Sequence, residues 1–192
     1  MWQFRNTGGG GKHTIIDAWQ SNYFKNIGVL NLQKAGISNF ELIENLSELA
    51  LPKLLAEGRK FDFCFIDGNH TFDHTLIDFF YLNRMMEVGG VIIFDDAGMP
   101  AIKKLLRYIL NYPAYQLIGN VNMNTTTKNK MVDWLIKTPL GWISKLLPGK
   151  LKHEIFSGKV IISDRKLRLN SSMVAIQKIK HDERNWHWFK DF

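Results

Sequence analysis

The stretch that decides the fold is Phe61-Asp-Phe-Cys-Phe-Ile-Asp67-Gly-Asn-His70, followed 20 residues after its end by Gly90-Val-Ile-Ile-Phe-Asp95-Asp96. Each segment is a short apolar run, rich in β-branched and aromatic residues, that ends on carboxylates. This pattern is typical of a buried parallel strand with acidic side chains at its carboxyl end. Because ligands bind at that edge of an open α/β sheet, the two segments predict a site as well as a fold.

Strands and helices alternate on both sides of these segments. Strands are predicted at residues 13–17, 40–44, 61–66, 91–94 and 172–179, and helices at 49–57, 73–86 and 101–110, with a further helix ending at 31–35. The alternation predicts an α/β fold with a mostly parallel, twisted sheet flanked by helices. In the helix at 73–86, the spacing of Leu76, Ile77 and Phe80 predicts the face that packs on the sheet.

The length and composition indicate one domain. With 192 residues and 45% hydrophobic content, the chain can bury a sizeable core, and we expect a single domain over 1–192. Its parts are predicted as a βαβ core at 12–119, a variable lid or insertion at 120–160, and a closing strand and tail at 161–192. No run is long and apolar enough to span a bilayer, and the first residues do not resemble a secretory signal, so we expect a cytoplasmic protein.

The positive charge is concentrated in the last third of the chain. The net charge is +7, and residues 121–192 hold 14 Lys and Arg against 6 Asp and Glu. This asymmetry indicates contact with an anionic partner or simply a solvated basic face. The segment 128–152 combines lysines with Trp134 and Trp142, which is typical of a membrane-surface helix or of a lid over an active site. No nucleic-acid motif accompanies the charge, so we expect no nucleic-acid partner.

Three aspartates at the ends of neighbouring strands predict a cation site. Asp67 ends one strand, and Asp95 with Asp96 ends the next, so their carboxylates meet at one edge. Clustered carboxylates repel one another unless a cation or protons neutralise them. Oxygen ligands favour Mg²⁺ or Ca²⁺ over zinc. The alternative is that these aspartates only cap the helices that follow.

His70 is the candidate general base. It lies three residues after Asp67, on the loop that enters the next helix. A histidine titrates near neutral pH and can accept the proton of a substrate hydroxyl. The alternative is a solvated loop histidine without a catalytic role. For His74, one turn later, a structural role is expected.

The two segments that end on Asp67 and Asp96 resemble class I S-adenosylmethionine-dependent methyltransferases. The resemblance also extends to Phe40-Glu-Leu-Ile-Glu-Asn-Leu-Ser47 and Gly89-Gly90. The pattern is most similar to the metal-dependent O-methyltransferases and to the small-molecule and sugar methyltransferases grouped with cephalosporin-hydroxylase-like proteins. The resemblance implies a Rossmann-like methyltransferase fold, S-adenosylmethionine as cofactor, and transfer to a hydroxyl of a small molecule or sugar.

The resemblance also implies roles for individual residues. Asp17 matches the acid that binds the cofactor ribose, and Ser47 matches a residue near the adenine. Asp67 belongs to both the cofactor site and the metal site, whose other ligands are Asp95 and Asp96. His70 stands where related catechol enzymes carry a lysine base.

One family feature is absent from the sequence. The family carries an earlier strand that ends in a glycine-rich loop, whereas Gly8–Gly11 precede a strand instead of joining a strand to a helix. The segment from Trp2 to Asn6 is too close to the next strand for a parallel crossover. We therefore expect an N-terminally incomplete fold, whose central gap is left by truncation or filled by another segment or subunit, as in a homo-oligomer. The alternative function is a non-catalytic, partner-binding remnant that no longer binds the cofactor.

Overall fold

A computed structural model describes residues 2–5, 11–122, 167, 169 and 171–190. The described strands are β1 (Trp2–Arg5), β2 (Lys12–Ile16), β3 (Phe40–Ile43), β4 (Phe61–Ile66), β5 (Met86–Phe94), β6 (Tyr115–Asn122) and β7 (Ser171–Lys178). The described helices are α1 (Ile27–Lys34), α2 (Ser47–Ala56), α3 (Phe72–Met85) and α4 (Pro100–Ile109). These bounds confirm the predicted strands and helices to within a few residues, apart from β5, which starts five residues early, and β1 and β6, which were not predicted.

The strands form one sheet in the order β3-β2-β1-β4-β5-β7-β6. β2 pairs with β3 and β4 with β5 in parallel, whereas β1 and β7 are antiparallel to both of their neighbours. Consequently β2 to β6 all run in one direction. The carboxyl ends of β2, β3, β4 and β5 therefore lie at one edge of the sheet, as the sequence predicts.

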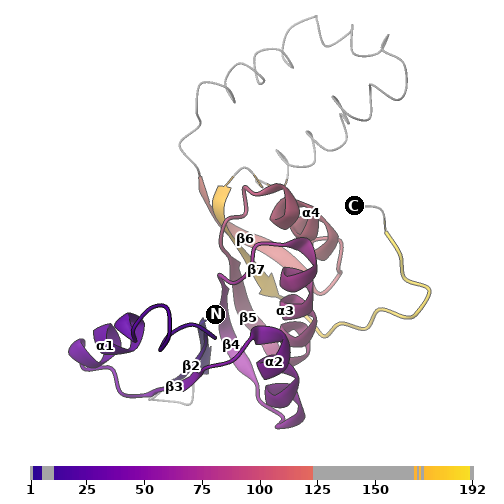
Figure 1. The fold of residues 1–192 in the computed structure, drawn as a ribbon. Coiled ribbons are helices and arrows are strands. Elements are labelled where there is room, and N and C mark those ends of the chain that lie inside the picture. The colour runs from indigo at the N-terminus through magenta and orange to yellow at the C-terminus, as the bar shows by residue number, and fades with distance from the viewer. Residues whose placement is uncertain (1, 6–10, 123–166, 168, 170, 191–192) are drawn as a thin grey trace, which may run out of the picture.

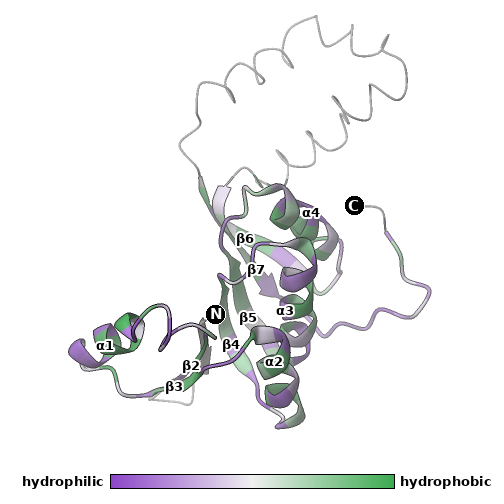
Figure 2. Ribbon diagram, viewed as in Figure 1, coloured by the Kyte–Doolittle hydropathy of each residue, from purple (hydrophilic) through white to green (hydrophobic). Residues whose placement is uncertain are grey.

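The helices α2, α3 and α4 lie side by side along the sheet, while α1 projects away from it (Figure 1). The core is built from residues of β4, β5 and β7 and from the inner faces of these helices. In α4 the buried residues recur at helical spacing: Ile102, Leu105, Leu106 and Ile109. No residue of α1 is buried, although Figure 2 shows that it carries apolar residues.

The centre of the sheet departs from the expectation of a gap. β1 lies between β2 and β4 and pairs with both, with Arg5 opposite Lys12 and Trp2 opposite Phe65. The expectation that the Trp2–Asn6 segment could not fill this place was wrong, because it considered only a parallel strand. An antiparallel neighbour needs only a tight turn.

A polar cluster holds β2 and β3 to the segment after α2. Glu41 accepts hydrogen bonds from Lys12 (2.6 Å), Thr14 (2.6 Å) and Arg59. Burial would raise the pKa of Glu41, but the hydrogen bonds from Arg59, Lys12 and Thr14 outweigh it and lower the pKa to about 2. These bonds hold together β2 and β3, which lie beside β1 at one side of the sheet, and join them to the segment after α2.

The predicted packing face of α3 is partly wrong. Ile77 is 38% exposed and Phe80 48% exposed, whereas Phe79 and Leu82 are buried. The helix is therefore rotated relative to the prediction, and Phe80 instead packs under the guanidinium of Arg84, 3.6 Å from its ring centre. Apolar spacing alone could not decide between two faces that both carry large apolar side chains.

The end of the chain also differs in part from expectation. Residues 120–122 belong to β6 and not to a loop, and the rest of the predicted loop or lid, including 128–152, lies outside the described residues. In the tail, Trp188 packs on Tyr112 with ring centroids 5.3 Å apart. Trp186 and Phe189, in contrast, are 87% and 75% exposed.

Gly90 provides a test of the packing between β4 and β5. A Cβ atom on Gly90 would lie 2.7 Å from Met86 Cε, 2.9 Å from the Glu87 carbonyl oxygen and 3.0 Å from the Asp62 carbonyl oxygen. Because two of these neighbours are backbone atoms, Gly90→Ala should lower the free energy of unfolding by about 1–3 kcal/mol in urea denaturation. Gly119→Ala is the matched control, since a Cβ there meets nothing within 4 Å. Equal stability of the two variants would contradict this account.

Candidate active site

The carboxylates at the strand ends meet because β4 and β5 are paired in register. Ile66 lies opposite Phe94, and the Asp95 N–H donates to the Ile66 carbonyl at 3.0 Å. Asp67 and Asp95 therefore leave the sheet at the same level. The sequence prediction that these two side chains converge agrees with this geometry.

Three side chains form a cluster that could hold a cation. Asp67, His70 and Asp95 each offer one ligand atom, and these atoms lie within 4.8 Å of one another. Burial raises the pKa of the Asp67 carboxyl, and the neighbouring Asp95 carboxylate raises it further. A cation placed there would relieve this repulsion, and the two carboxylates supply the oxygen ligands that a hard divalent ion prefers.

His70 lies between the carboxylates of both strands. Its Nε2 is 3.6 Å from Asp67 Oδ1 and 3.7 Å from Asp96 Oδ2. This nitrogen is buried and has no hydrogen-bond partner among the described residues. An unsatisfied ring nitrogen beside carboxylates is typical of a functional site, because it is available to a ligand or to a proton.

Asp96 is placed differently from the other predicted metal ligands. Its backbone is left-handed, with φ of 47°, a conformation that Asp tolerates better than most residues. Its carboxylate, 55% exposed, lies beside His70. The structure thus groups His70 with Asp67 and Asp95, and Asp96 contacts this cluster through His70.

The predicted cofactor residues lie along the same edge. Asp17 follows β2, and its two oxygens accept hydrogen bonds from the Trp19 N–H at 2.9 Å and the Gln20 side chain at 2.8 Å. Because β1 separates β2 from β4, Asp17 and Asp67 leave the sheet two strand spacings apart, about 10 Å. A ligand that contacted both would have to be elongated.

Ser47 is the first residue of α2, and the neighbouring helix α3 carries a buried carboxylate that the sequence analysis missed, Asp78. Asp78 is 2% exposed, and burial raises its pKa to about 6. Its helical spacing from Phe79 and Leu82, which are also buried, was the signal that could have revealed it. His74, expected to be structural, lies 2.8 Å from the Thr71 hydroxyl through its Nδ1.

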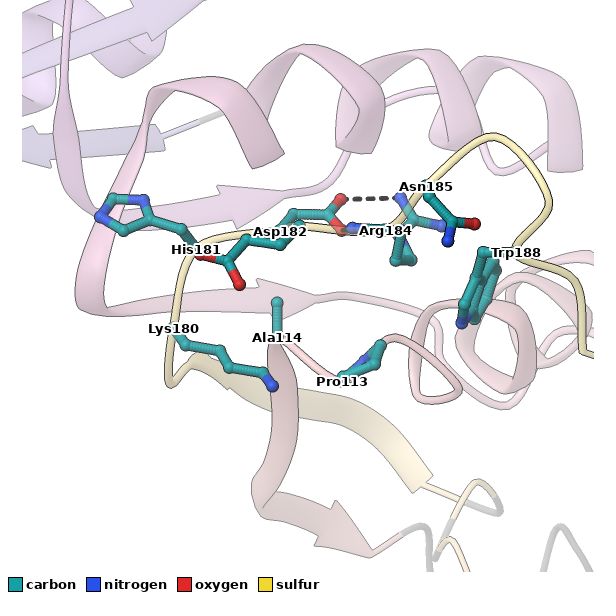
Figure 3. A pocket seen from close by; sticks show the side chains of 9 residues that line it. Pro113, Ala114, Lys180, His181, Asp182, Arg184, Asn185 and Trp188 are labelled. Carbon is teal, nitrogen blue, oxygen red and sulfur yellow. Dashed lines mark hydrogen bonds and ion pairs between the residues drawn. The ribbon is translucent and has the colours of Figure 1, made fainter.

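A separate cavity of about 240 Å³ lies at the opposite edge of the sheet, where β7 ends (Figure 3). It is lined by the C-terminal tail, in which Arg184 donates to Asp182 at 2.6 Å and lies over the Tyr112 ring. Because β5 and β7 are antiparallel, this cavity is remote from the carboxylates at the ends of β4 and β5. It belongs to the packing of the tail and not to the predicted site.

Residues 2–97 match the family model described as a methyltransferase domain. The chain belongs to this family. The matched range contains all six predicted site residues, and it confirms the methyltransferase resemblance on which their roles depend. A search of curated proteins finds no match.

A solved methyltransferase shares the fold, and two further solved structures are reported as similar. An rRNA methylase from Streptococcus thermophilus is 13% identical with a TM-score of 0.50, over 87% of this chain and 73% of that one. Cofactor-bound Rv0187 from MTB and an O-methyltransferase from Bacillus cereus in complex with SAH are each 20% identical, with TM-scores of 0.47, over 55% of this chain. This chain spans 52% and 53% of those two proteins, about half of their length. No helix among the described residues is long and apolar enough to cross a membrane.

The buried carboxyl of Asp78 should make stability depend on pH. An acid whose pKa rises on folding favours the folded state below its unfolded pKa of about 4, and this contribution is lost as pH rises through about 6. At neutral pH, Asp78→Asn should therefore be more stable than the wild type, by up to about 3 kcal/mol, and the difference should vanish below about pH 4. Urea denaturation across this pH range measures it.

Asp73→Asn, on the exposed side of the same helix, is the control. It should not reproduce the gain in stability at neutral pH. A neutral-pH stability of Asp78→Asn equal to or below that of the wild type would show that the Asp78 carboxylate is better solvated or paired than its burial indicates.

Proposed function

We propose that this chain is an S-adenosylmethionine-dependent O-methyltransferase, acting in the cytoplasm on a hydroxyl of a small molecule or sugar with the help of Mg²⁺ or Ca²⁺. The observation that carries the proposal is the convergence of Asp67, His70 and Asp95 at one sheet edge in a methyltransferase-domain chain. The SAH complex of the Bacillus cereus O-methyltransferase supports the choice of cofactor.

The predicted cofactor residues suit an elongated nucleoside ligand. Each oxygen of Asp17 accepts one internal hydrogen bond and keeps further acceptor capacity for the ribose hydroxyls. Ser47 lies at the start of α2, where its hydroxyl oxygen could face an adenine. Asp67 follows β4, two strand spacings from Asp17. The methyl-donating end of the cofactor would extend toward Asp67.

The acidic cluster suits a divalent cation. Asp67, Asp95 and Asp96 would hold it, and when bound it would lower the pKa of a substrate hydroxyl. Burial raises the pKa of the Asp67 carboxyl and the neighbouring Asp95 carboxylate raises it further, so a cation would relieve the repulsion between the two. Their exposure leaves room for the acceptor, since Asp67 is 44% and Asp96 55% exposed.

His70 is the proposed base. Its Nε2 would take the hydroxyl proton, and the flanking Asp67 and Asp96 carboxylates, 3.6 and 3.7 Å away, would stabilise the imidazolium that forms. The hydroxyl oxygen would then attack the cofactor methyl in line. Holding both reactants in this geometry would supply much of the rate acceleration.

Cofactor binding is the first test. Calorimetric titration of the folded chain with S-adenosylhomocysteine should give saturable binding with one site, and Asp17→Ala should weaken it by about tenfold, the loss of hydrogen bonds to a charged acceptor. Glu57→Ala, an exposed carboxylate after α2, is the control and should bind as the wild type does. Absence of binding by folded wild-type protein would refute the proposed cofactor.

Metal binding is the second test. Asp67→Asn and Asp95→Asn should each weaken Mg²⁺ or Ca²⁺ binding by about tenfold or more, because loss of even an outer-shell partner has this effect. His70→Ala should leave metal affinity unchanged but lower kcat by about a hundredfold or more if His70 is the base. A loss of metal affinity in His70→Ala would instead make His70 a ligand, and unchanged affinity in both aspartate variants would exclude this metal site.

A non-catalytic, partner-binding module is the second candidate. The observation that favours it is the antiparallel direction of β1, which ends at Arg5, opposite Lys12 and thus at the edge away from the carboxylates. Among the described residues, no glycine loop therefore reaches the place where the methionine end of the cofactor would lie. The titration with S-adenosylhomocysteine separates the two candidates.

A further inference from the structure

The segment between β2 and β3 exposes large apolar side chains to solvent. Residues 19–37 of this segment, which include α1, are called the arm below. Five of its large apolar side chains are between 46% and 77% exposed: Trp19, Tyr23, Phe24, Ile27 and Leu30. Exposed apolar side chains that gather on one segment, unlike single scattered ones, are typical of a contact surface.

The helix of the arm is short and unsupported. α1 spans eight residues, none of which is buried, and its N-cap Asn26 makes no side-chain capping hydrogen bond. An isolated helix shorter than about 12–15 residues is marginal in water, and most helical stability in proteins comes from packing of an apolar face. α1 therefore needs a surface to pack on.

Hydrogen bonds near both ends of the arm hold it in its projecting position. Near its start, the Ser21 N–H donates to Glu44 Oε1 at 2.7 Å. Just after its end, the Asn39 side chain donates to the Gly11 carbonyl oxygen. Because the arm is anchored away from its own sheet (Figure 1), its apolar side chains are available to a second molecule.

The sheet has a face of matching chemistry. On one face of β4, β5 and β7, buried side chains pack under α2, α3 and α4. Side chains alternate along a strand, so the residues between the buried ones belong to the opposite face. These residues, called the second face below, are apolar and half-buried: Phe63, Phe65, Val91, Ile93 and Ala175. Phe65, Ile93 and Ala175 form one row across the three strands. Parallel strands are normally covered on both faces, and none of the described helices covers the second face (Figure 1).

We propose that the arm of one copy of this chain packs on the second face of another copy, and the reverse, so that two chains form a symmetric dimer by exchange of arms. A closed twofold arrangement satisfies both surfaces of both chains. The inference is independent of the proposed function, because neither surface contains a predicted site residue.

The dimensions of the two surfaces support this occupant. The exposed parts of the five arm side chains amount to about 450 Å², taking roughly 200 Å² for a whole aromatic and roughly 100 Å² for a whole aliphatic side chain. Two arms on two faces would bury about 1,800 Å², within the range of about 1,200–2,000 Å² for a stable interface. The eight residues of α1 extend about 12 Å, enough to cross two or three strands that lie about 4.8 Å apart.

Sedimentation velocity over a concentration series measures the assembly. The wild type should dimerise with a Kd of about 1 μM or lower, because interfaces of this area range from micromolar to picomolar affinity. The double variant Tyr23→Glu, Ile27→Glu should raise the Kd by about a hundredfold or more, because it buries charges in an apolar interface. Trp186→Glu, which changes an 87% exposed aromatic residue of the tail, is the matched control and should dimerise as the wild type does.

Ala175→Lys tests the second face. In the monomer the lysine can extend its ammonium into solvent, so the variant should fold, but the Kd should rise as in the arm variant. Ile77→Lys, on the 38% exposed side of α3, is its control and should remain dimeric. Circular dichroism checks that each variant is folded, and Val91→Lys replaces Ala175→Lys if the latter does not fold.

Mixing the arm variant with the face variant tests the exchange itself. The mixed dimer keeps one intact contact, between the arm of the face variant and the second face of the arm variant. The mixture should therefore dimerise more tightly than either variant alone.

Three outcomes would overturn the proposal. The first is a wild type that stays monomeric at about 100 μM, a hundred times the expected Kd. The second is a dimer that survives the arm substitutions. The third is a dimer that the arm substitutions break and the face substitutions do not, which would show that the arms contact each other instead of the sheet.

Discussion

The parallel pairing of β4 with β5 is the constraint on which the site depends. Cys64, Ile66, Ile92 and Phe94 are all buried, with 4% exposure or less, and they alternate with more exposed neighbours. A slip of one residue in either strand would turn this buried set to the opposite face. The core therefore fixes the register, and the register fixes the level at which the two carboxylate-bearing ends leave the sheet.

The carboxylate that holds the outer strands together and the carboxylates of the candidate site have different surroundings. Glu41, on β3, is surrounded by hydrogen-bond donors that outweigh its burial and keep it ionised. At the sheet edge, Asp67 faces another carboxylate, and the buried His70 nitrogen lacks a hydrogen bond among the described residues. Groups whose charges are left unbalanced in this way are typical of sites completed by a ligand. Asp78 extends the pattern, since it is buried and its Oδ1 has no hydrogen-bond partner among the described residues.

The central strand shows how backbone pairing can be satisfied by more than one topology. Unpaired backbone groups in the middle of a sheet are costly, so some strand has to lie between β2 and β4. β1 meets this requirement by pairing antiparallel with β2, with Arg5 opposite Lys12. Because β1 therefore ends at the edge away from the carboxylates, a filled sheet centre does not bring the end of this strand to the candidate site.

From the amino-acid sequence alone we could predict the α/β class, the strands that end on Asp17, Asp67 and Asp95, and the edge where these residues gather. This was possible because hydrophobic runs and their polar ends are local signals, and parallel strands share one carboxyl edge. Three features required the folded structure: the direction of β1, the buried face of α3 and the burial of Asp78. Each of these depends on which segments, distant in the chain, pack against each other, and a choice between two apolar faces or two strand directions leaves no mark in local spacing.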